Sequence, residues 1–435
     1  MNSAAIERSN VGNIRLHVLP TDRFKTYAVT VHIGRRLSED HVTPTALIPF
    51  VLRRGNSRFP ETKTFREHLE LLYGAGFGFD VTKRGDYQVV QFRMDMIHEK
   101  YVDHPHSLLE ETLRFLGDTI TRPLLEDGIF RKLYVEAEKN TLEKRIQSLI
   151  NDKIRYAAER CIEEMCAGEP YRLHPLGRIE EIGRITPASL YEDYRRWLKE
   201  AAIDIYVVGS VSMSEVKSLV AEAFQYENNE PRAYEQVEPV QHARKEPKTV
   251  IERLDITQGK LNLGLRLPVT YADPDYPAAL VYNGILGAYP HSKLFTHVRE
   301  RASMAYYVSS RLHGHKGILA IQSGIEIANF EKANEIIRQQ LEAIKDGQIS
   351  DQELEKTKKM MCSQLREILD SAYEMTAFDF NNVLAGTDRT VASLIEAIQE
   401  VEKDDVQRIA QTVQLDTIYF LRDGEGGRDV ERNTP

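Results

Sequence analysis

The sequence has few cysteines and no long apolar run. Its 435 residues include three cysteines, Cys161, Cys166 and Cys362, too few for a disulfide framework in a chain of this length and consistent with a reducing compartment. No window approaches about 18 consecutive apolar residues, and the first residues, MNSAAIERSNVGN, show no basic stretch followed by an apolar one. We therefore expect neither a membrane span nor a signal peptide, and a cytoplasmic protein.

An excess of basic residues is also missing. The chain has 57 Lys and Arg against 66 Asp and Glu, a net charge of −9, which argues against nonspecific binding to nucleic acid. With 42% apolar and 28% charged residues, its composition is that of a globular protein. Its length exceeds that of one ordinary domain, so we expect at least two.

A polar segment, residues 226–248, divides the chain. The segment, YENNEPRAYEQVEPVQHARKEPK, contains three prolines and no apolar periodicity, which is typical of a linker. We predict domains at residues 1–225 and 249–435. Each half contains an amphipathic helix followed by an apolar strand, RITPASLYEDYRRWLKEAAIDIYVVG in the first and VEKDDVQRIAQTVQLDTIYFL in the second. This shared order predicts a duplicated fold.

Helix and strand patterns alternate within each half. Strands are predicted at residues 89–96 and 260–267, where apolar residues partly alternate with polar ones. Two long helical segments are predicted at residues 127–165 and 349–370, the second with Asp351 as its cap. We expect an α+β fold: two similar mixed α/β sandwiches, each an antiparallel-rich sheet with helices packed on one face, arranged like the shells of a clam.

No complete zinc-binding motif occurs in the sequence. The stretch 45–55, TALIPFVLRRG, follows an apolar strand at residues 27–33. This setting resembles the first active-site helix of the pitrilysin/insulinase zinc peptidases, the inverzincins, in which HxxEH supplies two imidazoles and a catalytic carboxylate. The corresponding positions are Ala46, Pro49 and Phe50. None of them can bind zinc or act as a general base, and Pro49 is expected to end or kink the helix.

A later helix resembles the segment that carries the remaining zinc ligand of that family. In the family pattern, a second glutamate seven residues after a first one binds the metal. The first glutamate here is Glu138, and the position seven residues later is Arg145. A guanidinium about 4 Å from a dication would oppose binding by roughly 8 kcal/mol at an effective dielectric near 20. The resemblance therefore implies that the zinc site is lost as a set and that this chain holds no metal or cofactor.

The second half resembles the same family in a block without metal ligands. Residues 283–310, NGILGAYPHSKLFTHVRERASMAYYVSS, resemble the family segment S-x-L-F…R-E…A-Y, in which an arginine and a tyrosine lie seven residues apart; Arg299 and Tyr306 have that spacing. The resemblance implies that both contact a bound peptide near the scissile bond, where a guanidinium and a phenol can hold the peptide carbonyl. The alternative, an exposed ion pair for Arg299 and a packing role for Tyr306, stays open.

Over nearly the whole chain, the resemblance implies a catalytically inactive peptidase subunit. The sequence is similar to zinc-free members that pair with a zinc-bearing homologue in bacterial heterodimers and in mitochondrial processing peptidase. We expect this chain to form part of a peptide-binding chamber, while the partner subunit carries the zinc. Two alternatives remain: a non-proteolytic scaffold that binds a peptide or protein, for example as a homodimer, and an independent peptidase that acts through a site without a recognisable motif.

Overall fold

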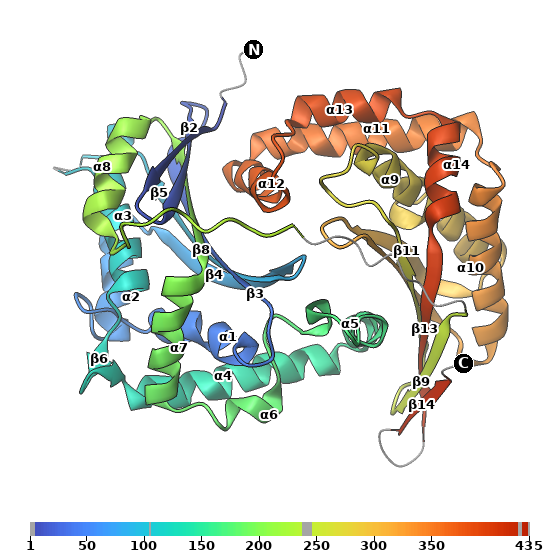
Figure 1. The fold of residues 1–435 in the computed structure, drawn as a ribbon, viewed down its shortest axis with the longest axis horizontal. Coiled ribbons are helices and arrows are strands. Elements are labelled where there is room, and N and C mark those ends of the chain that lie inside the picture. The colour runs from blue at the N-terminus through green and yellow to red at the C-terminus, as the bar shows by residue number, and fades with distance from the viewer. Residues whose placement is uncertain (1–4, 104–105, 237–245, 425–428, 434–435) are drawn as a thin grey trace. The chain divides into compact units, whose positions relative to one another are not determined.

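The computed structural model describes residues 5–103, 106–236, 246–424 and 429–433. The chain forms two compact units of mixed α/β structure (Figure 1). The first unit comprises Met1–Gln147, Leu173–Glu235 and Ala372–Thr376, and the second comprises Ser148–Arg172, Gln236–Ser371 and Ala377–Pro435. Among the described residues, no helix is both long and apolar enough to cross a membrane.

A six-stranded sheet forms the centre of the first unit. Its strands, in order across the sheet, are β1 (Glu7–Val11), β2 (Ile14–Pro20), β8 (Ala202–Gly209), β3 (Thr26–Arg36), β5 (Tyr87–Ile97) and β4 (Gly76–Arg84). β2 and β8 run parallel, whereas the other neighbours are antiparallel. β4 is therefore one edge of this sheet, and the buried strand β3 lies near its middle.

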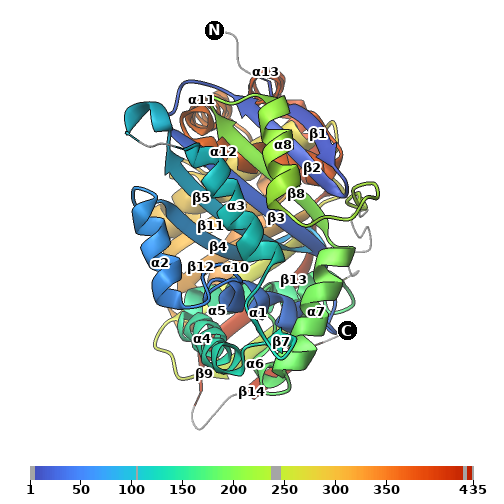
Figure 2. The same cartoon turned by 90° about the vertical axis from the view of Figure 1, so that its left-hand side faces the viewer.

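Helices cover one face of the first sheet. Figure 2 shows α2, α3, α7 and α8 over that face. The helical segments are α1 (Val42–Leu52), α2 (Thr62–Leu71), η1 (Glu99–Tyr101), α3 (Leu108–Thr121), α4 (Lys132–Asn151), α6 (Ile179–Ile182), α7 (Pro187–Glu200) and α8 (Met213–Ala223). A short hairpin, β6 (Leu125–Glu126) and β7 (Ile129–Phe130), precedes α4.

The second sheet repeats the strand order of the first, except that one edge strand follows the other strands along the chain instead of preceding them. Its order is β14 (Asp429–Asn433), β9 (Lys248–Leu254), β13 (Gln414–Asp423), β10 (Gly259–Arg266), β12 (Ile318–Ile325) and β11 (Ala305–His313). These strands occupy the places of β1, β2, β8, β3, β5 and β4, and the parallel pair, β13 with β9, falls at the same place as β2 with β8. The order and directions of the strands therefore show the predicted duplication.

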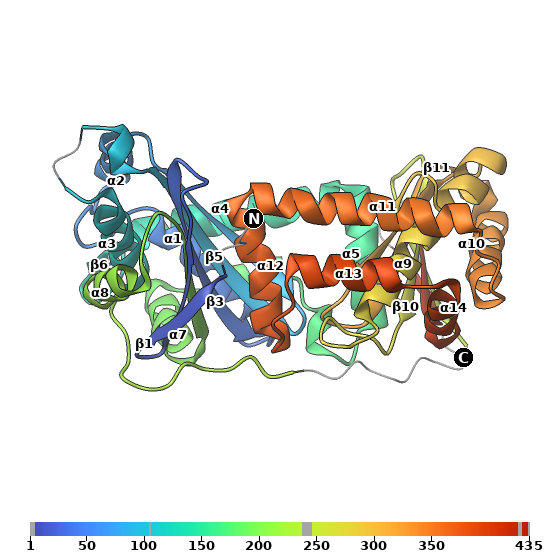
Figure 3. The same ribbon diagram turned by 90° about the horizontal axis from the view of Figure 1, so that it is seen from above.

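An apolar core lies between the second sheet and the helices of the second half. Leu261, Leu263 and Leu265 of β10 pack there with residues such as Ile337 and Ile398. Figure 3 shows α11 and α13 running side by side. The helical segments are α9 (Tyr276–Asn283), the π-helical η3 (Gly284–Ala288) and η4 (Phe295–Arg301), η5 (Ile327–Asn329), α10 (Phe330–Lys345), α11 (Asp351–Glu367), η6 (Ile368–Asp370), α12 (Ala372–Ala385), α13 (Val391–Glu400) and α14 (Lys403–Thr412).

Helix α5 (Lys153–Met165) belongs to the second unit although it precedes the predicted linker, and the short η2 (Pro170–Arg172) follows it. It packs on β10 and β13, with Cys161 buried against Val250 and Tyr419. Gly264 of β10 permits this approach, because a Cβ there would lie 2.6 Å from the Met165 sulfur.

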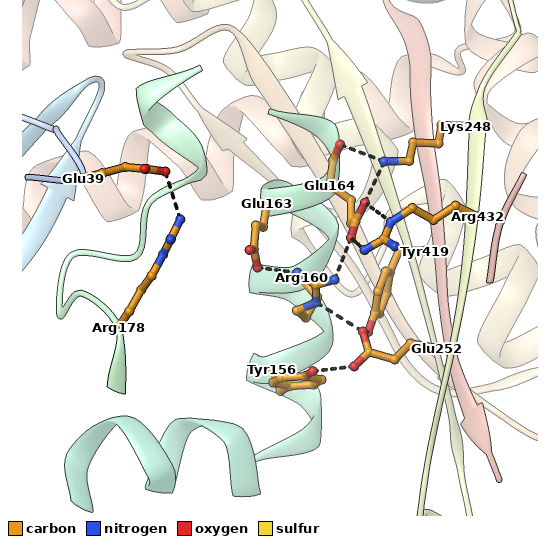
Figure 4. A network of polar contacts seen from close by, with 10 residues as sticks. All are labelled: Glu39, Tyr156, Arg160, Glu163, Glu164, Arg178, Lys248, Glu252, Tyr419 and Arg432. Carbon is orange, nitrogen blue, oxygen red and sulfur yellow. Dashed lines mark hydrogen bonds and ion pairs between the residues drawn. The ribbon is translucent and has the colours of Figure 1, made fainter. Parts of the chain in front are cut away.

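An ion network holds α5 to the second sheet (Figure 4). Glu164 accepts hydrogen bonds from Arg160 at 2.6 Å, Lys248 at 2.6 Å and Arg432 at 2.9 Å. Arg160 also donates to Glu252 of β9 at 3.2 Å. Each of the two carboxylates, Glu164 and Glu252, accepts from several donors. Removing either carboxylate would therefore leave buried cations without their partner.

Two predicted helix boundaries are wrong. The segment 127–165 is not one helix, because it breaks at Asp152, whose carboxylate caps α5 by accepting from the Ile154 and Arg155 N–H groups at 3.2 Å. α11 is capped by Ser350 rather than Asp351: the Ser350 hydroxyl accepts from the Glu353 N–H at 3.2 Å, and the Glu353 carboxylate accepts from the Ser350 N–H at 2.8 Å. This reciprocal pair satisfies two donors at the helix start.

The first part of the predicted linker is hydrogen-bonded to strands of the first sheet. The Tyr234 hydroxyl is buried and donates to Asp204 at 3.0 Å, and the Glu235 N–H donates to the Tyr87 hydroxyl at 2.8 Å. Residues 237–245 of the linker lie outside the described residues. The predicted domain boundaries at residues 225 and 249 stay a prediction.

Candidate functional site

α1 contains the three positions that correspond to a zinc-binding motif. Ala46, Pro49 and Phe50 lie in this helix, and each of its residues is buried. The helix continues past Pro49 to Leu52, and the Arg53 N–H donates to the Pro49 carbonyl at 3.2 Å. Pro49 therefore does not end the helix, and a kink at this residue stays a prediction. A proline inside a helix removes its own N–H donor, and its ring crowds the carbonyl four residues earlier, here that of Thr45. The burial of the whole helix outweighs this cost.

Arg145 faces Phe50. The carbon of its guanidinium lies 5.7 Å from the centre of the Phe50 ring, a distance at which the cation is attracted to the ring face. Arg145 also lies 3.5 Å from the Asp80 carboxylate, and the Phe50 ring meets Phe79 edge to face, with centres 4.8 Å apart. The structure thus brings positions 50 and 145 together, and a ring and a guanidinium fill the space between the two helices.

Glu138 is bound by the two arginines that follow α1. This carboxylate is fully buried on α4. Arg53 donates to one of its oxygens at 3.3 Å, and Arg54 donates to the other. The Arg53 guanidinium also lies 5.5 Å from the ring centres of Phe50 and Phe79. This ion pair was not predicted from the sequence, although the adjacent arginines directly after residues 45–52 were an available signal.

The donor groups near α1 do not fit a zinc ion. Zinc is held by imidazole, thiolate or carboxylate groups. Here the guanidinium groups of Arg53, Arg54 and Arg145 surround the carboxylates of Glu138 and Asp80. Across residues 5–103, 106–236, 246–424 and 429–433, no three His, Cys, Asp or Glu side chains are grouped as metal ligands. That the chain carries no zinc stays a prediction.

Arg299 lies on the π-helical segment η4 of the second unit. It is exposed, and its guanidinium carbon lies 4.8 Å from the centre of the Phe295 ring. Val298 is the buried residue that anchors the segment. π-Helical turns are rare and frequently occur at functional sites. The stacking on Phe295 orients Arg299 while leaving its N–H groups accessible.

Tyr306 lies on β11, which is the edge of the second sheet. Ala305 pairs with Ile325 and Tyr307 pairs with Gly324, so Tyr306 is the additional residue of a β-bulge. Such bulges re-aim a side chain. Its side chain is 56% exposed, and its hydroxyl forms no hydrogen bond with any described residue.

Tyr306 is the second residue of the edge strand β11, and η4, which carries Arg299, contacts that strand. An edge strand presents backbone N–H and C=O groups that have no partner on one side, and an extended peptide can pair with such an edge. A guanidinium and a phenol at its beginning can donate hydrogen bonds to a peptide carbonyl. The arrangement is therefore suited to peptide binding, and the assignment of Arg299 and Tyr306 to substrate stays a prediction.

Comparisons with known proteins agree with these observations. Residues 184–361 match the family model described as Peptidase M16 inactive domain. The chain is 40% identical over 421 residues to the probable inactive metalloprotease YmfF of Bacillus subtilis (strain 168), which covers 96% of this chain and 98% of that protein. It is 24% identical over 324 residues to the uncharacterized zinc protease YmxG of the same organism, covering 72% and 76% of the two chains.

Solved structures show the same fold. A conserved protein from Enterococcus faecalis V583 matches with a TM-score of 0.90 and 29% identity, over 97% of this chain and 99% of that one. The peptidase M16 inactive domain from Pseudomonas fluorescens matches with a TM-score of 0.78 and 17% identity, over 96% and 98%. At that identity the likeness concerns the fold alone. The predicted α+β fold class is confirmed.

Proposed function

Since this chain belongs to the M16 family of pitrilysin/insulinase-like peptidases, we propose that it is the catalytically inactive subunit of a two-chain zinc peptidase in the cytoplasm. A homologous partner would supply the zinc, the water and the general base. This chain would supply part of the chamber in which the peptide is held. It would have no peptidase activity alone.

The proposal rests on two observations. The positions that the family resemblance assigns to the zinc site carry no group that can bind the metal. In the second unit, Arg299 and Tyr306 are exposed. Ala46, Pro49 and Phe50 are buried, and Arg145 packs against the Phe50 ring. Independent zinc chemistry is therefore not supported by these residues. An accessible phenol at the edge of a sheet, as at Tyr306, supports a ligand-binding role for this part of the second unit.

Arg299 and Tyr306 would bind the peptide rather than cleave it. The Tyr306 hydroxyl would donate to a peptide carbonyl, and the Arg299 guanidinium would stabilise negative charge that develops on that oxygen. Strand β11 would align the peptide backbone by pairing with it. Each of these roles uses groups that are exposed on the second unit.

The proposal is tested by mixing this chain with an M16 homologue that has an intact HxxEH motif. We expect each chain alone to be inactive and the mixture to cleave a fluorogenic peptide. Arg299→Ala should lower kcat/KM of the mixture by about 100-fold, the usual effect of removing a donor to the developing oxyanion. Arg66→Ala is a matched control, because Arg66 is an exposed arginine on α2 of the first unit.

Three outcomes would contradict the proposal or the role it gives to Arg299. No gain of activity on mixing, combined with peptide binding by this chain alone, would favour a non-proteolytic scaffold. One zinc ion per isolated chain by elemental analysis, with activity that a chelator removes, would show an independent enzyme. An equal loss of activity in Arg66→Ala would remove Arg299 from the peptide site.

A further inference from the structure

One face of the second sheet carries two buried polar side chains on the central strand β10. Leu261 and Leu263 of this strand pack in the core on the side covered by α10 and α13. Successive residues of a strand alternate between the two faces, so Lys260 and Asn262 lie on the opposite face, on which α5 packs. Their exposed fractions are 6% and 3%. Both side chains therefore need partners within the protein or on a ligand.

Lys260 differs from the other buried lysines of the described chain. Each of the others forms an ion pair with a glutamate: Lys248 with Glu164 at 2.6 Å, Lys293 with Glu353 at 2.8 Å and Lys316 with Glu169 at 3.0 Å. Lys260 forms no ion pair with any described residue, and its ammonium donates to the side-chain oxygen of Gln258. Buried lysines are normally paired with an opposite charge, so the surroundings of Lys260 are suited to an anion.

The Asn262 amide is a second donor without an acceptor. Its Nδ2 group is buried and donates no hydrogen bond within the part of the chain that the structure describes, although buried polar groups usually have a partner. Asn262 follows Lys260 by two residues, so the two side chains begin about 7 Å apart on the same face. An acceptor that lies between them can serve both groups.

Tyr307 extends this cluster to the edge strand β11. Tyr307 and Lys260 pair with Gly324 of β12 from its two sides. The Tyr307 ring lies over Gly324, where a Cβ would overlap it, and the Lys260 ammonium lies 5.9 Å from the ring centre. The Tyr307 hydroxyl forms no hydrogen bond with any described residue. Burial and the charge of Asp152 raise its pKa to about 12, so the hydroxyl is protonated and can donate at neutral pH.

One carboxylate lies near the cluster but does not neutralise it. Asp152 caps α5 by accepting from two N–H groups of that helix, and no ion pair joins it to Lys260 among the described contacts. Burial lowers the pKa of Lys260, and the charge of Asp152 offsets part of that shift. An anion bound beside the ammonium would raise the pKa further, because an opposite charge favours the charged form. The cluster therefore has an affinity for negative charge.

The ligand group that fits these three side chains is a carboxylate. Its two oxygens accept several hydrogen bonds, and its charge is opposite to that of Lys260. Ser309 and Arg311 lie on the same face of β11 as Tyr307 and are exposed, so this face is accessible beside the cluster. A peptide that pairs with β11 directs every second side chain towards this face. A carboxylate on such a peptide can reach the cluster.

We infer that Lys260, Asn262 and Tyr307 bind a carboxylate of the peptide that lies along β11, so that acidic peptides are the preferred substrates. The carboxylate belongs either to an aspartate or glutamate side chain or to the C-terminal end of the peptide. The inference rests on the proposed function, because that function places a peptide at β11. Binding requires only this chain, so its test does not use the zinc-bearing partner.

The test measures binding of rhodamine-labelled peptides of seven residues to the full chain by fluorescence anisotropy. The first peptide has a central glutamate and an amidated C-terminus, and the second, neutral peptide has glutamine in place of that glutamate. The third has the central glutamine and a free C-terminal carboxylate. The first or the third should bind about tenfold more tightly than the second, as expected for hydrogen bonds to a charged group. The one that does so identifies the source of the carboxylate.

Two variants test the residues. Lys260→Met keeps the length of the side chain and removes its charge, so it should bind all three peptides as weakly as the natural chain binds the neutral one. It should unfold at the same or a higher urea concentration, because a buried cation without a counter-ion is unfavourable. Tyr307→Phe should reduce the preference several-fold. The matched control, Lys332→Met, removes the same charge from an exposed position on α10 and should keep the full preference.

Equal binding of the three peptides by the natural chain, or binding of none, would overturn the inference. An unchanged preference in Lys260→Met, or an equal loss in Lys332→Met, would do the same. Displacement of the labelled peptide by sodium acetate as readily as by unlabelled peptide would also overturn it, because the cluster would then bind any small carboxylate. These results are separate from the mixing experiment: activity on mixing without a preference for carboxylate would contradict this site alone, and a preference without activity would contradict the two-chain peptidase alone.

Discussion

The two units share one sheet order but differ in the segment that follows the strand at the sheet centre. In the first unit β3 leads to α1, which is entirely buried. In the second unit β10 leads to α9 and then to η3 and η4, where Arg299 is exposed. Ala46, Pro49 and Phe50, which the family resemblance assigns to a zinc motif, are part of a core, whereas Arg299 and Tyr306 are exposed. This difference separates residues that now stabilise the fold from residues available to a ligand.

The largest expected effect is on the core around Phe50. Phe50→Ala should lower the free energy of unfolding by about 3–5 kcal/mol, because it removes a buried ring and leaves a cavity. Phe50→Leu, which keeps most of the volume, should cost less than about 1.5 kcal/mol. Urea unfolding at pH 7 measures both. A loss below about 1 kcal/mol for Phe50→Ala would show that the ring is not part of the stabilising core.

The ion network of the second unit should make its stability depend on pH. Burial by itself would raise the pKa of Glu164, but hydrogen bonds from Arg432 and Lys248 and the charge of Arg160 lower the pKa to about 2. Since the pKa of an unfolded glutamate is about 4.3, the carboxylate contributes up to about 3 kcal/mol above that pH. The contribution is lost as the pH falls from about 4.3 towards 2.

Unfolding of the natural chain and of Glu164→Gln by urea, compared between pH 7 and pH 3, tests this dependence. The variant should be less stable at pH 7, and the two stability curves should approach each other on acidification. A mutation at an exposed acid, Glu222→Gln, is the control. Parallel curves for Glu164→Gln and the natural chain would contradict the assigned role of the network.

A smaller effect is expected at the carboxylate beside α1. Glu138→Ala should cost about 1–2 kcal/mol in the free energy of unfolding, because it removes charged hydrogen bonds from a buried group. The cost is limited because the side chains of Arg53 and Arg54 are 42% and 32% exposed and can turn towards water. Urea unfolding compares this variant with Glu138→Gln, which keeps the shape. A loss above about 3 kcal/mol would indicate stranded buried charges instead.

The smallest effect on stability is expected at Arg299 and Tyr306. Arg299→Ala and Tyr306→Ala should change the free energy of unfolding by no more than about 0.5 kcal/mol, as is usual for exposed side chains. The same variants should reduce peptidase activity in a mixture with a zinc-bearing homologue. Thermal unfolding and activity, measured on the same preparations, separate the two effects. A stability loss above about 1 kcal/mol would assign the pair to the fold rather than to a ligand.

Sequence patterns predicted the parts of the fold that depend on local periodicity. The strand expected at residues 89–96 lies within β5, and that expected at residues 260–267 largely coincides with β10. The contact between Phe50 and Arg145 was predictable from the family resemblance, because the resemblance assigns both positions to the same metal site. In the same way, the exposure of Arg299 and Tyr306 agrees with a pair expected to meet a ligand.

The contacts between distant segments could not be predicted in this way. The packing of α5 on the second sheet depends on Gly264 and on carboxylates such as Glu252, far away in the sequence. The spacing of apolar residues predicts which face of a helix is buried, but it does not predict which sheet that face packs on.

The membership of α5 in the second unit has a practical consequence for anyone who divides the gene. A cut at the polar linker would express residues 249–435 without the helix that covers β10 and β13. The apolar patch around Val250 and Tyr419 would then be open to water, and exposed patches of this kind promote aggregation. A soluble fragment of the second half should therefore carry residues 148–172 with it, joined by a short artificial connection.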